Sequence, residues 1–185
     1  MNPTPCTSEG TCRPPGAALR RCLLALASFL AGCTSVQTGI EINAPAKAVR
    51  AVLFNIDDYP NWNPYLVKVD GTLAPGSQLY LTVKPVGGAE ITANATVTSV
   101  TENQLSWNGT GLSQLGSGPI TLAVPGILSA RHDFIIEELG PGKTFFHNDT
   151  NFSGSVIPFY DLKPIEAGME AMNQALKKRA EGPVP

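Results

Sequence analysis

Two histidines, His132 and His147, are the side chains of this sequence best suited to acid or base chemistry near neutral pH. His132 alternates with Phe134 and so shares one face of a strand with it. Facing a pocket, His132 could donate a hydrogen bond to a ligand carbonyl or act as a general acid or base. Alternatively, it is a structural histidine bonded to a backbone carbonyl or a carboxylate. His147 is expected to point outward if its neighbour Phe146 points inward.

No metal site and no cofactor are predicted. The two histidines are fifteen residues apart and no cysteine accompanies them, so they form no ligand spacing. The run from Gly111 to Gly116 contains Ser113 but is one residue too long for the nucleophile elbow of a serine hydrolase. Gly87 and Gly88 indicate a hairpin turn, without a phosphate-binding pattern around them.

Cys33 is a candidate for covalent modification. It ends the run Leu30-Ala31-Gly32-Cys33, which follows a short apolar stretch and the pair Arg20-Arg21. A charged region, an apolar core too short to span a bilayer, and small residues before a cleavage point are the parts of a secretory signal. The ending resembles the bacterial lipobox, at which Cys33 would receive a lipid and become the mature N-terminus. The alternative is a buried apolar helix that ends in Gly-Cys by chance.

These parts predict a cleaved lipoprotein signal over residues 1–32 and a short polar tether over residues 33–35, followed by one domain over residues 36–182. The protein would be anchored at the bacterial cell envelope, on the periplasmic or extracellular face. Cleavage would leave ten basic and fourteen acidic side chains and no cysteine besides Cys33. A mildly acidic domain argues against nucleic acid as the main partner, and a domain without disulfides needs a hydrophobic core.

The residues after the tether predict mixed α and β structure. A strand is expected over Val36–Ile42, a helix from Ala44 to about Asn55, and a turn over Asp57–Tyr65 that carries three aromatic rings. Short turns rich in Gly or Asn then separate runs typical of an antiparallel meander. These runs are Val67–Leu73, Gln78–Lys84, Glu90–Val100, Leu105–Asn108, Ala130–Leu139 and Lys143–Phe152.

A long amphipathic helix is predicted over Phe159–Glu181. Its apolar residues are spaced alternately three and four apart, while polar residues, Asn173 among them, are expected to face away. Asp161 is expected to cap its N-terminus. Met169 and Met172 lie in the apolar stripe, either as adaptable contacts to a ligand or as ordinary core residues. Such a helix on the concave face of a bent antiparallel sheet gives an α+β domain with room for a pocket.

The segment Gly109–Leu128 is rich in glycine at first and then apolar. It is an edge strand, a lid over a cavity mouth, or a membrane-facing loop.

The sequence resembles the START-like group of polyketide cyclases and lipid carriers, also called SRPBCC. The resemblance rests on Ile42 to Val49, on Tyr59-Pro60-Asn61-Trp62-Asn63-Pro64-Tyr65, and on the helix from Gly168 to Lys177. It implies the helix-grip, Bet v 1-like fold: a curved antiparallel sheet of about six to seven strands wrapped on a long C-terminal helix, with two short helices near the N-terminus. The group includes apolar ligand carriers and cyclases, so membership by itself does not supply an activity.

The leading functional hypothesis is a binding protein for a small hydrophobic or amphipathic ligand. The alternatives are a cyclase-like or dehydratase-like enzyme that uses His132 as acid or base, and a structural lipoprotein whose side chains fill its own cavity. Each tryptophan either lines the pocket or packs in the core. The residues expected to line the pocket are Trp62, Trp107, His132, Phe134, Met169 and Met172.

Overall fold

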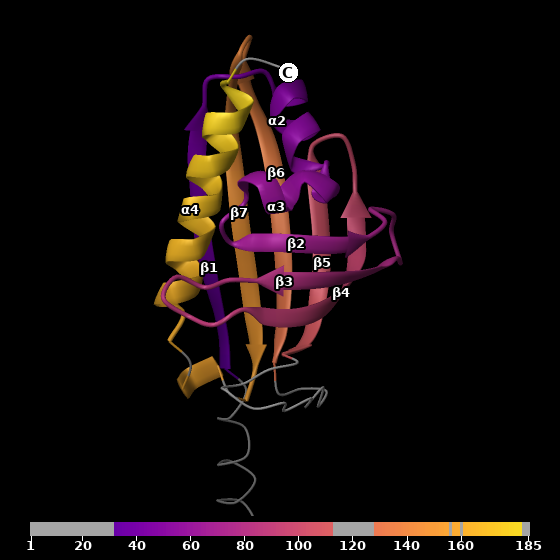
Figure 1. The fold of residues 1–185 in the computed structure, drawn as a ribbon, viewed down its shortest axis with the longest axis vertical. Helices are drawn as coiled ribbons and strands as arrows, with labels where there is room; N and C mark the ends of the chain where they lie inside the picture. The colour runs from indigo at the N-terminus through magenta and orange to yellow at the C-terminus, as the bar shows by residue number, and fades with distance from the viewer. Residues whose placement is uncertain (1–31, 113–127, 156, 160, 183–185) are drawn as a thin grey trace, which may run out of the picture. The chain divides into compact units, whose positions relative to one another are not determined.

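Seven strands form one antiparallel sheet in the computed structural model, which describes residues 32–112, 128–155, 157–159 and 161–182. Along the sheet the strands follow the order β1-β7-β6-β5-β4-β3-β2, so the two ends of the chain's strand region meet at the β1–β7 pair (Figure 1). The strands are β1 (Gly32–Ile42), β2 (Leu66–Gly71), β3 (Gln78–Val83), β4 (Ile91–Val100), β5 (Gln104–Leu112), β6 (Ser129–Gly140) and β7 (Lys143–Gly154).

The sheet is strongly bent. Figure 1 shows β2 and β3 running across the direction of β1, β6 and β7. Register shifts accompany the bend, at Leu66/Lys68 between β2 and β3 and at two places between β4 and β5. An extra residue on one strand of a pair bends that strand and increases its twist. The sheet therefore has a concave inner face.

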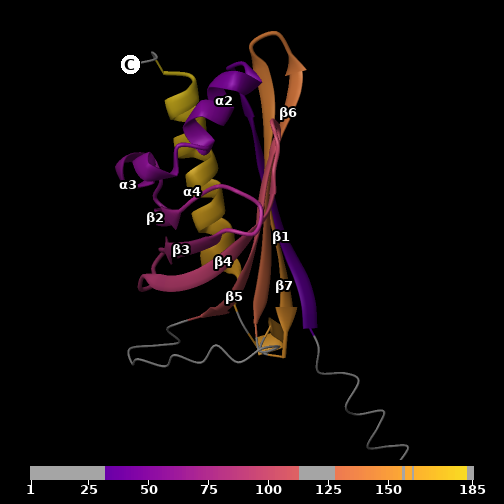
Figure 2. The ribbon, with the colours of Figure 1, turned by 90° about the vertical axis from the view of Figure 1, so that its right-hand side faces the viewer.

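The helices lie on the inner side of this sheet. They are α2 (Ala46–Leu53), the 3-10 turn η1 (Ile56–Asp58), α3 (Tyr59–Trp62), the 3-10 turn η2 (Ile157–Phe159) and α4 (Lys163–Ala180). The long helix α4 packs along β1 and contacts β7 and α2, as the two views agree (Figures 1 and 2). These elements confirm the predicted helix-grip α+β fold.

Helix α4 contributes its apolar stripe to the core. Met169, Met172 and Leu176 are fully buried between the helix and the sheet. Asp161 accepts a hydrogen bond from the backbone N–H of Lys163 at 3.1 Å, which satisfies one donor of the first turn. Asn173, which was expected to face away, is instead buried, because it belongs to a polar network that joins α4 to the sheet.

Several boundaries differ from the sequence prediction. The first helix is shorter, Ala46–Leu53, and the predicted turn over Asp57–Tyr65 contains most of η1 and all of α3. Residues 33–35 form no tether, because β1 begins at Gly32 and pairs with β7 from its first residue. Helix α4 begins at Lys163, and Phe159 lies before it in η2. Gly109–Leu112 belongs to β5, which has a neighbour on both sides and is no edge strand, whereas residues 113–127 lie outside the described residues.

Candidate functional site

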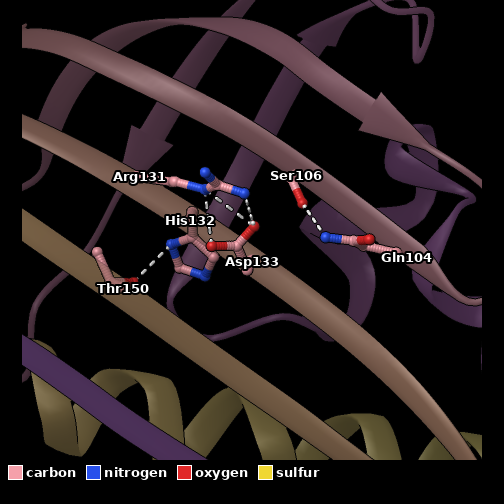
Figure 3. A network of polar contacts seen from close by, with 6 residues as sticks. All are labelled: Gln104, Ser106, Arg131, His132, Asp133 and Thr150. Carbon is pink, nitrogen blue, oxygen red and sulfur yellow. Dashed lines mark hydrogen bonds and ion pairs between the residues drawn. The ribbon is translucent and has the colours of Figure 1, made fainter.

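A buried polar network lies between the inner face of the sheet and α4, with His132 of β6 near its centre. The Nε2 atom of His132 is 2.9 Å from Asn148 Oδ1, and its Nδ1 atom is 2.9 Å from Thr150 Oγ1. Asn148 Nδ2 donates to Asn173 Oδ1 at 2.8 Å, and Asn173 Nδ2 donates to Thr38 Oγ1 at 3.0 Å. Figure 3 shows the contact between His132 and Thr150, whose strands are neighbours.

The direction of these hydrogen bonds determines the tautomer of His132. Asn148 uses its amide nitrogen to donate to Asn173, so only its oxygen is left to meet His132. An amide oxygen accepts, so the proton of the imidazole lies on Nε2 and Nδ1 accepts from the Thr150 hydroxyl. Both ring nitrogens are therefore engaged by the protein itself.

Burial keeps this imidazole neutral. His132 is buried, which lowers its pKa to about 4, although the hydrogen bond to Asn148 and the charge of Asp133 oppose the shift. A general base near neutral pH needs a free nitrogen within reach of its substrate. With both nitrogens occupied, the arrangement favours the structural interpretation of His132 and gives the enzyme hypothesis no free group here.

A cavity of about 100 Å³ lies next to this network, between the bent sheet and the N-terminal half of α4. Helix α4 contributes Ile165 to the cavity wall. Tyr65, from the segment between α3 and β2, also lines it. His132 and Thr150 are polar members of the wall, and both are committed to the network described above. The wall consists of Tyr65, Leu66, Leu81, Val83, Pro85, Ile91, Ala93, Trp107, Gly109, Leu128, Ala130, His132, Thr150, Phe152 and Ile165.

Two of the predicted pocket residues lie in this wall. Trp107 and His132 stack against each other with ring centroids 5.6 Å apart, and both face the cavity. Phe134 is fully buried and packs behind them, with its ring centroid 5.1 Å from that of Trp107. Met169 and Met172 are also fully buried, and their sulfur atoms lie against the polar network. These three residues support the wall from behind.

Trp62 is placed elsewhere. It is half-buried at the end of α3 and packs edge-on against Tyr59, with ring centroids 5.1 Å apart. Its indole nitrogen is buried without a hydrogen-bond partner among the described residues. Trp62 does not belong to the described cavity wall, and its ring serves the packing of α3 on the domain.

Sequence reasoning missed most of the wall because it consists of ordinary apolar residues. Ala93 and Ala130 face the cavity from their strands. The alternation of residues along the strand predicts this inward orientation for Ala93. Their small side chains leave space that a larger residue would fill. Ile165 lies one turn before Met169 on the predicted stripe. Nothing in the spacing of these residues distinguishes a cavity wall from a filled core.

The other two reactive side chains lie outside the cavity. His147 points outward, as expected, and its Nε2 atom is 3.0 Å from Glu137 on the outer face of the sheet. Cys33 is exposed at the beginning of β1. Within the described residues there is no cluster of three or more His, Cys, Asp or Glu that could hold a metal ion. No helix in that part of the chain is long and apolar enough to cross a membrane.

Comparison with known proteins supports the fold. A START superfamily protein from Mycobacterium smegmatis shares 23% identity, with 81% of this chain and 98% of the other covered at a TM-score of 0.60. The Zhui aromatase/cyclase from Streptomyces sp. R1128 shares 17% identity over 81% and 94% of the two chains, also at 0.60. Norcoclaurine synthase from Thalictrum flavum shares 13% identity over 81% and 95%, at 0.56. No curated protein sequence matches this chain.

At these identities the structural likeness concerns the fold alone. The sequence itself matches the family described as polyketide cyclase / dehydrase and lipid transport over residues 34–181. That range contains every described element that builds the cavity wall. The chain therefore belongs to the polyketide cyclase / dehydrase and lipid transport family and is a START-fold protein of ligand-binding or cyclase-like type.

Proposed function

We propose that this protein is a lipid-anchored extracytoplasmic binding protein that holds the apolar part of a small hydrophobic or amphipathic ligand between the sheet and α4. The observation that carries this proposal is the cavity of about 100 Å³ with its almost wholly apolar wall. The two polar members of the network that reach this wall, His132 and Thr150, already bond to each other. The cavity therefore selects an apolar group.

The size of the cavity limits what enters it. Ligand sites for drug-sized molecules are about 300–1,000 Å³, whereas a cavity of about 150 Å³ holds a benzene ring. One ring or the end of a hydrocarbon chain is thus the expected occupant. Four buried methylene groups would contribute about 3 kcal/mol, which alone corresponds to a dissociation constant of roughly 6 mM. The rest of the ligand must contribute contacts at the cavity mouth.

The proposed anchor is the lipobox-like run Leu30-Ala31-Gly32-Cys33. Cleavage before Cys33 and attachment of lipid to its thiol would place the domain on the periplasmic or extracellular face of the bacterial cell envelope. The thiol is exposed and so accessible to modification. A single acyl chain gives only marginal membrane binding, so the anchor requires more than one chain.

Binding is tested by titrating fluorescent fatty-acid and aromatic probes and following the quenching of Trp107 in a Trp62→Phe background. Ala130→Leu fills the cavity and should weaken probe binding at least about tenfold, the equivalent of 1.4 kcal/mol. Ala51→Leu is the matched control, because Ala51 is exposed on α2. Thermal melting checks that both variants fold.

Wild-type affinity in the Ala130→Leu variant would contradict the assignment of this cavity as the binding site. The absence of probe binding, together with the absence of a co-purifying molecule in native mass spectrometry, would contradict the binding function itself.

A further inference from the structure

Cys33 lies beside the cavity wall in the strand register. Across β1, β7 and β6, Cys33 pairs with Ser153 and Ser153 pairs with Ser129. The next row inward along the same strands contains Phe152 and Ala130, which both line the cavity. Strands are about 4.8 Å apart, so the Cys33 backbone is roughly 10 Å from the β6 end of the wall. The predicted attachment point and the cavity thus share one end of the sheet.

The connection between this attachment point and the domain has no slack. Thr34 pairs with Phe152, and the ladder continues without a shift to the end of β1. A flexible linker of n residues spans about 5–6 Å times the square root of n and leaves the orientation of a domain free. Here the acylated residue would itself be part of the sheet. A lipid on Cys33 would therefore hold this end of the domain at the membrane surface.

Two large apolar side chains are exposed at the same end. Phe159 is 83% exposed in η2, which packs on β1 and β7. Val86 is 54% exposed in the loop after β3, and its backbone N–H donates to the carbonyl of Pro164 at 3.2 Å. That loop also contains Pro85, a member of the cavity wall. Scattered exposed apolar residues are normal, but Val86 follows Pro85 of the cavity wall, and Phe159 lies in η2 beside the β1–β7 pair that contains Cys33.

The charged residues at this end of the domain do not favour binding to an anionic membrane surface. Lys84 and Lys163 flank the two apolar side chains, and Glu90 and Asp161 lie in the same two connections. The signs balance, so contact with a bilayer would rest on apolar insertion and on the anchor rather than on anionic lipid.

We infer that the end of the domain formed by Cys33, Val86 and Phe159 rests against the phospholipid bilayer, so that the cavity takes the acyl-chain end of a membrane lipid directly from it. This inference rests on the proposed function, in particular on lipidation of Cys33. The geometry removes the need for an apolar chain to cross water between the bilayer and the cavity, since the wall begins one residue row from the anchor. It also explains how so small a cavity binds usefully: the rest of the lipid stays in the membrane.

The test uses the mature lipoprotein purified from bacterial membranes and reconstituted into phosphatidylcholine vesicles whose acyl chains carry bromine near the headgroup. Phe159→Trp places a reporter at the proposed contact. Leu139→Trp is the matched control, because Leu139 is 47% exposed near the β6–β7 hairpin, at the far end of β6 from Ser129. Subtracting the signal of the parent protein removes Trp62 and Trp107. The reporter at 159 should show at least about twofold stronger bromine quenching than the reporter at 139, and a blue-shifted emission.

Equal quenching at the two positions would overturn the inference. A second variant inserts six Gly and Ser residues between Cys33 and Thr34, and it should reduce quenching at 159 to the level at 139. Unchanged quenching after the insertion would overturn the claim that the anchor sets the orientation. Intact mass separates this failure from that of the proposed function. Without added lipid mass at Cys33 both fail, whereas lipid mass and probe binding with equal quenching refute the bilayer contact alone.

Discussion

At the scale of single residues, His132 is the most informative side chain. Its two nitrogens join Asn148 and Thr150, and through Asn148 the network reaches Asn173 of α4. Each member donates and accepts in one consistent direction, so the buried polar groups are satisfied without a charge. His132 is thus part of a network that joins β6, β7 and α4 beside the cavity.

The neutrality of His132 makes stability depend on pH. The unfolded chain takes up a proton on this imidazole below pH 6.5, whereas the folded protein keeps it neutral down to about pH 4. Its contribution to the free energy of unfolding is thus fully present above pH 6.5 and decreases as the pH falls, by about 3 kcal/mol in total. Urea unfolding at pH 7 and pH 4.5 should show a smaller loss for His132→Gln than for the parent. An equal loss in both would contradict the prediction, and His147→Gln is the control.

At the scale of elements, α4 packs closely against Tyr65, which lies between α3 and β2. A Cβ atom on Gly168 would lie 2.4 Å from Cδ2 of the buried Tyr65 ring. In an exposed helix Gly→Ala stabilises by about 1 kcal/mol, but overpacking a buried contact costs about 1–3 kcal/mol. Gly168→Ala should therefore lower the free energy of unfolding by about 1 kcal/mol in urea titrations. It should also alter probe binding, because Tyr65 lines the cavity.

The control for this variant is Ala175→Gly in the same helix. It should lose about 1 kcal/mol through backbone entropy while leaving probe binding unchanged. A stabilised Gly168→Ala protein would show that the ring of Tyr65 moves aside without cost.

The outer face of the β6–β7 pair contains a cross-strand pair of like charges. Asp133 is directly opposite Asp149 and bonds to Arg131, with 3.0 Å between Nε and Oδ2. Burial raises the pKa of the Asp149 carboxyl, the charge of Asp133 raises it further, and His147 opposes both. A raised folded-state pKa means that the charged form opposes folding near pH 7 and that stability is regained as the pH falls through that pKa.

Asp149→Asn should therefore increase the free energy of unfolding at pH 7 by roughly 0.2–1 kcal/mol, the range for a cross-strand pair. Chemical unfolding at pH 7 and pH 4 measures it, and the gain should shrink at the lower pH. Asp70→Asn is the control. Asp70 is exposed, and its ion pair is with the exposed side chain of Lys68 on the same strand. No gain at Asp149, or a gain of the same size at both positions, would refute the like-charge explanation.

At the scale of the whole molecule, the proposed anchor decides where the domain works. Cys33→Ser removes the thiol but should leave the fold intact, because the side chain is exposed. The variant should lack the lipid mass at residue 33. It should appear either as a soluble protein or as a precursor that still carries its signal segment. Detergent partitioning and intact-mass measurement check both. A variant that stays in the detergent phase as a cleaved protein would contradict the anchor.

Much of this architecture is encoded locally. Alternation along Gln78–Lys84 and Ala130–Leu139 predicts which side chains face inward, and the spacing of Ile165, Met169 and Met172 predicts the buried side of α4. These patterns depend only on the two-residue period of a strand and the 3.6-residue period of a helix, so the spacing of apolar residues in the sequence is enough to predict them. The signal-like run ending at Cys33 is likewise a local pattern, and it remains a prediction.

Only the tertiary structure decided which inward-facing residues surround a space. Trp107 and Ala130 line the cavity while Phe134 and Met172 fill the core, although all four are apolar and inward on their elements. The difference arises from the bend of the sheet and the distance of α4 from each strand, which depend on contacts between segments far apart in the chain. The same holds for Asn173. Local periodicity predicts that it faces solvent, but it is buried and accepts a hydrogen bond from Asn148 of β7. Sequence by itself determined the elements and their faces; the packing of those elements decided the site.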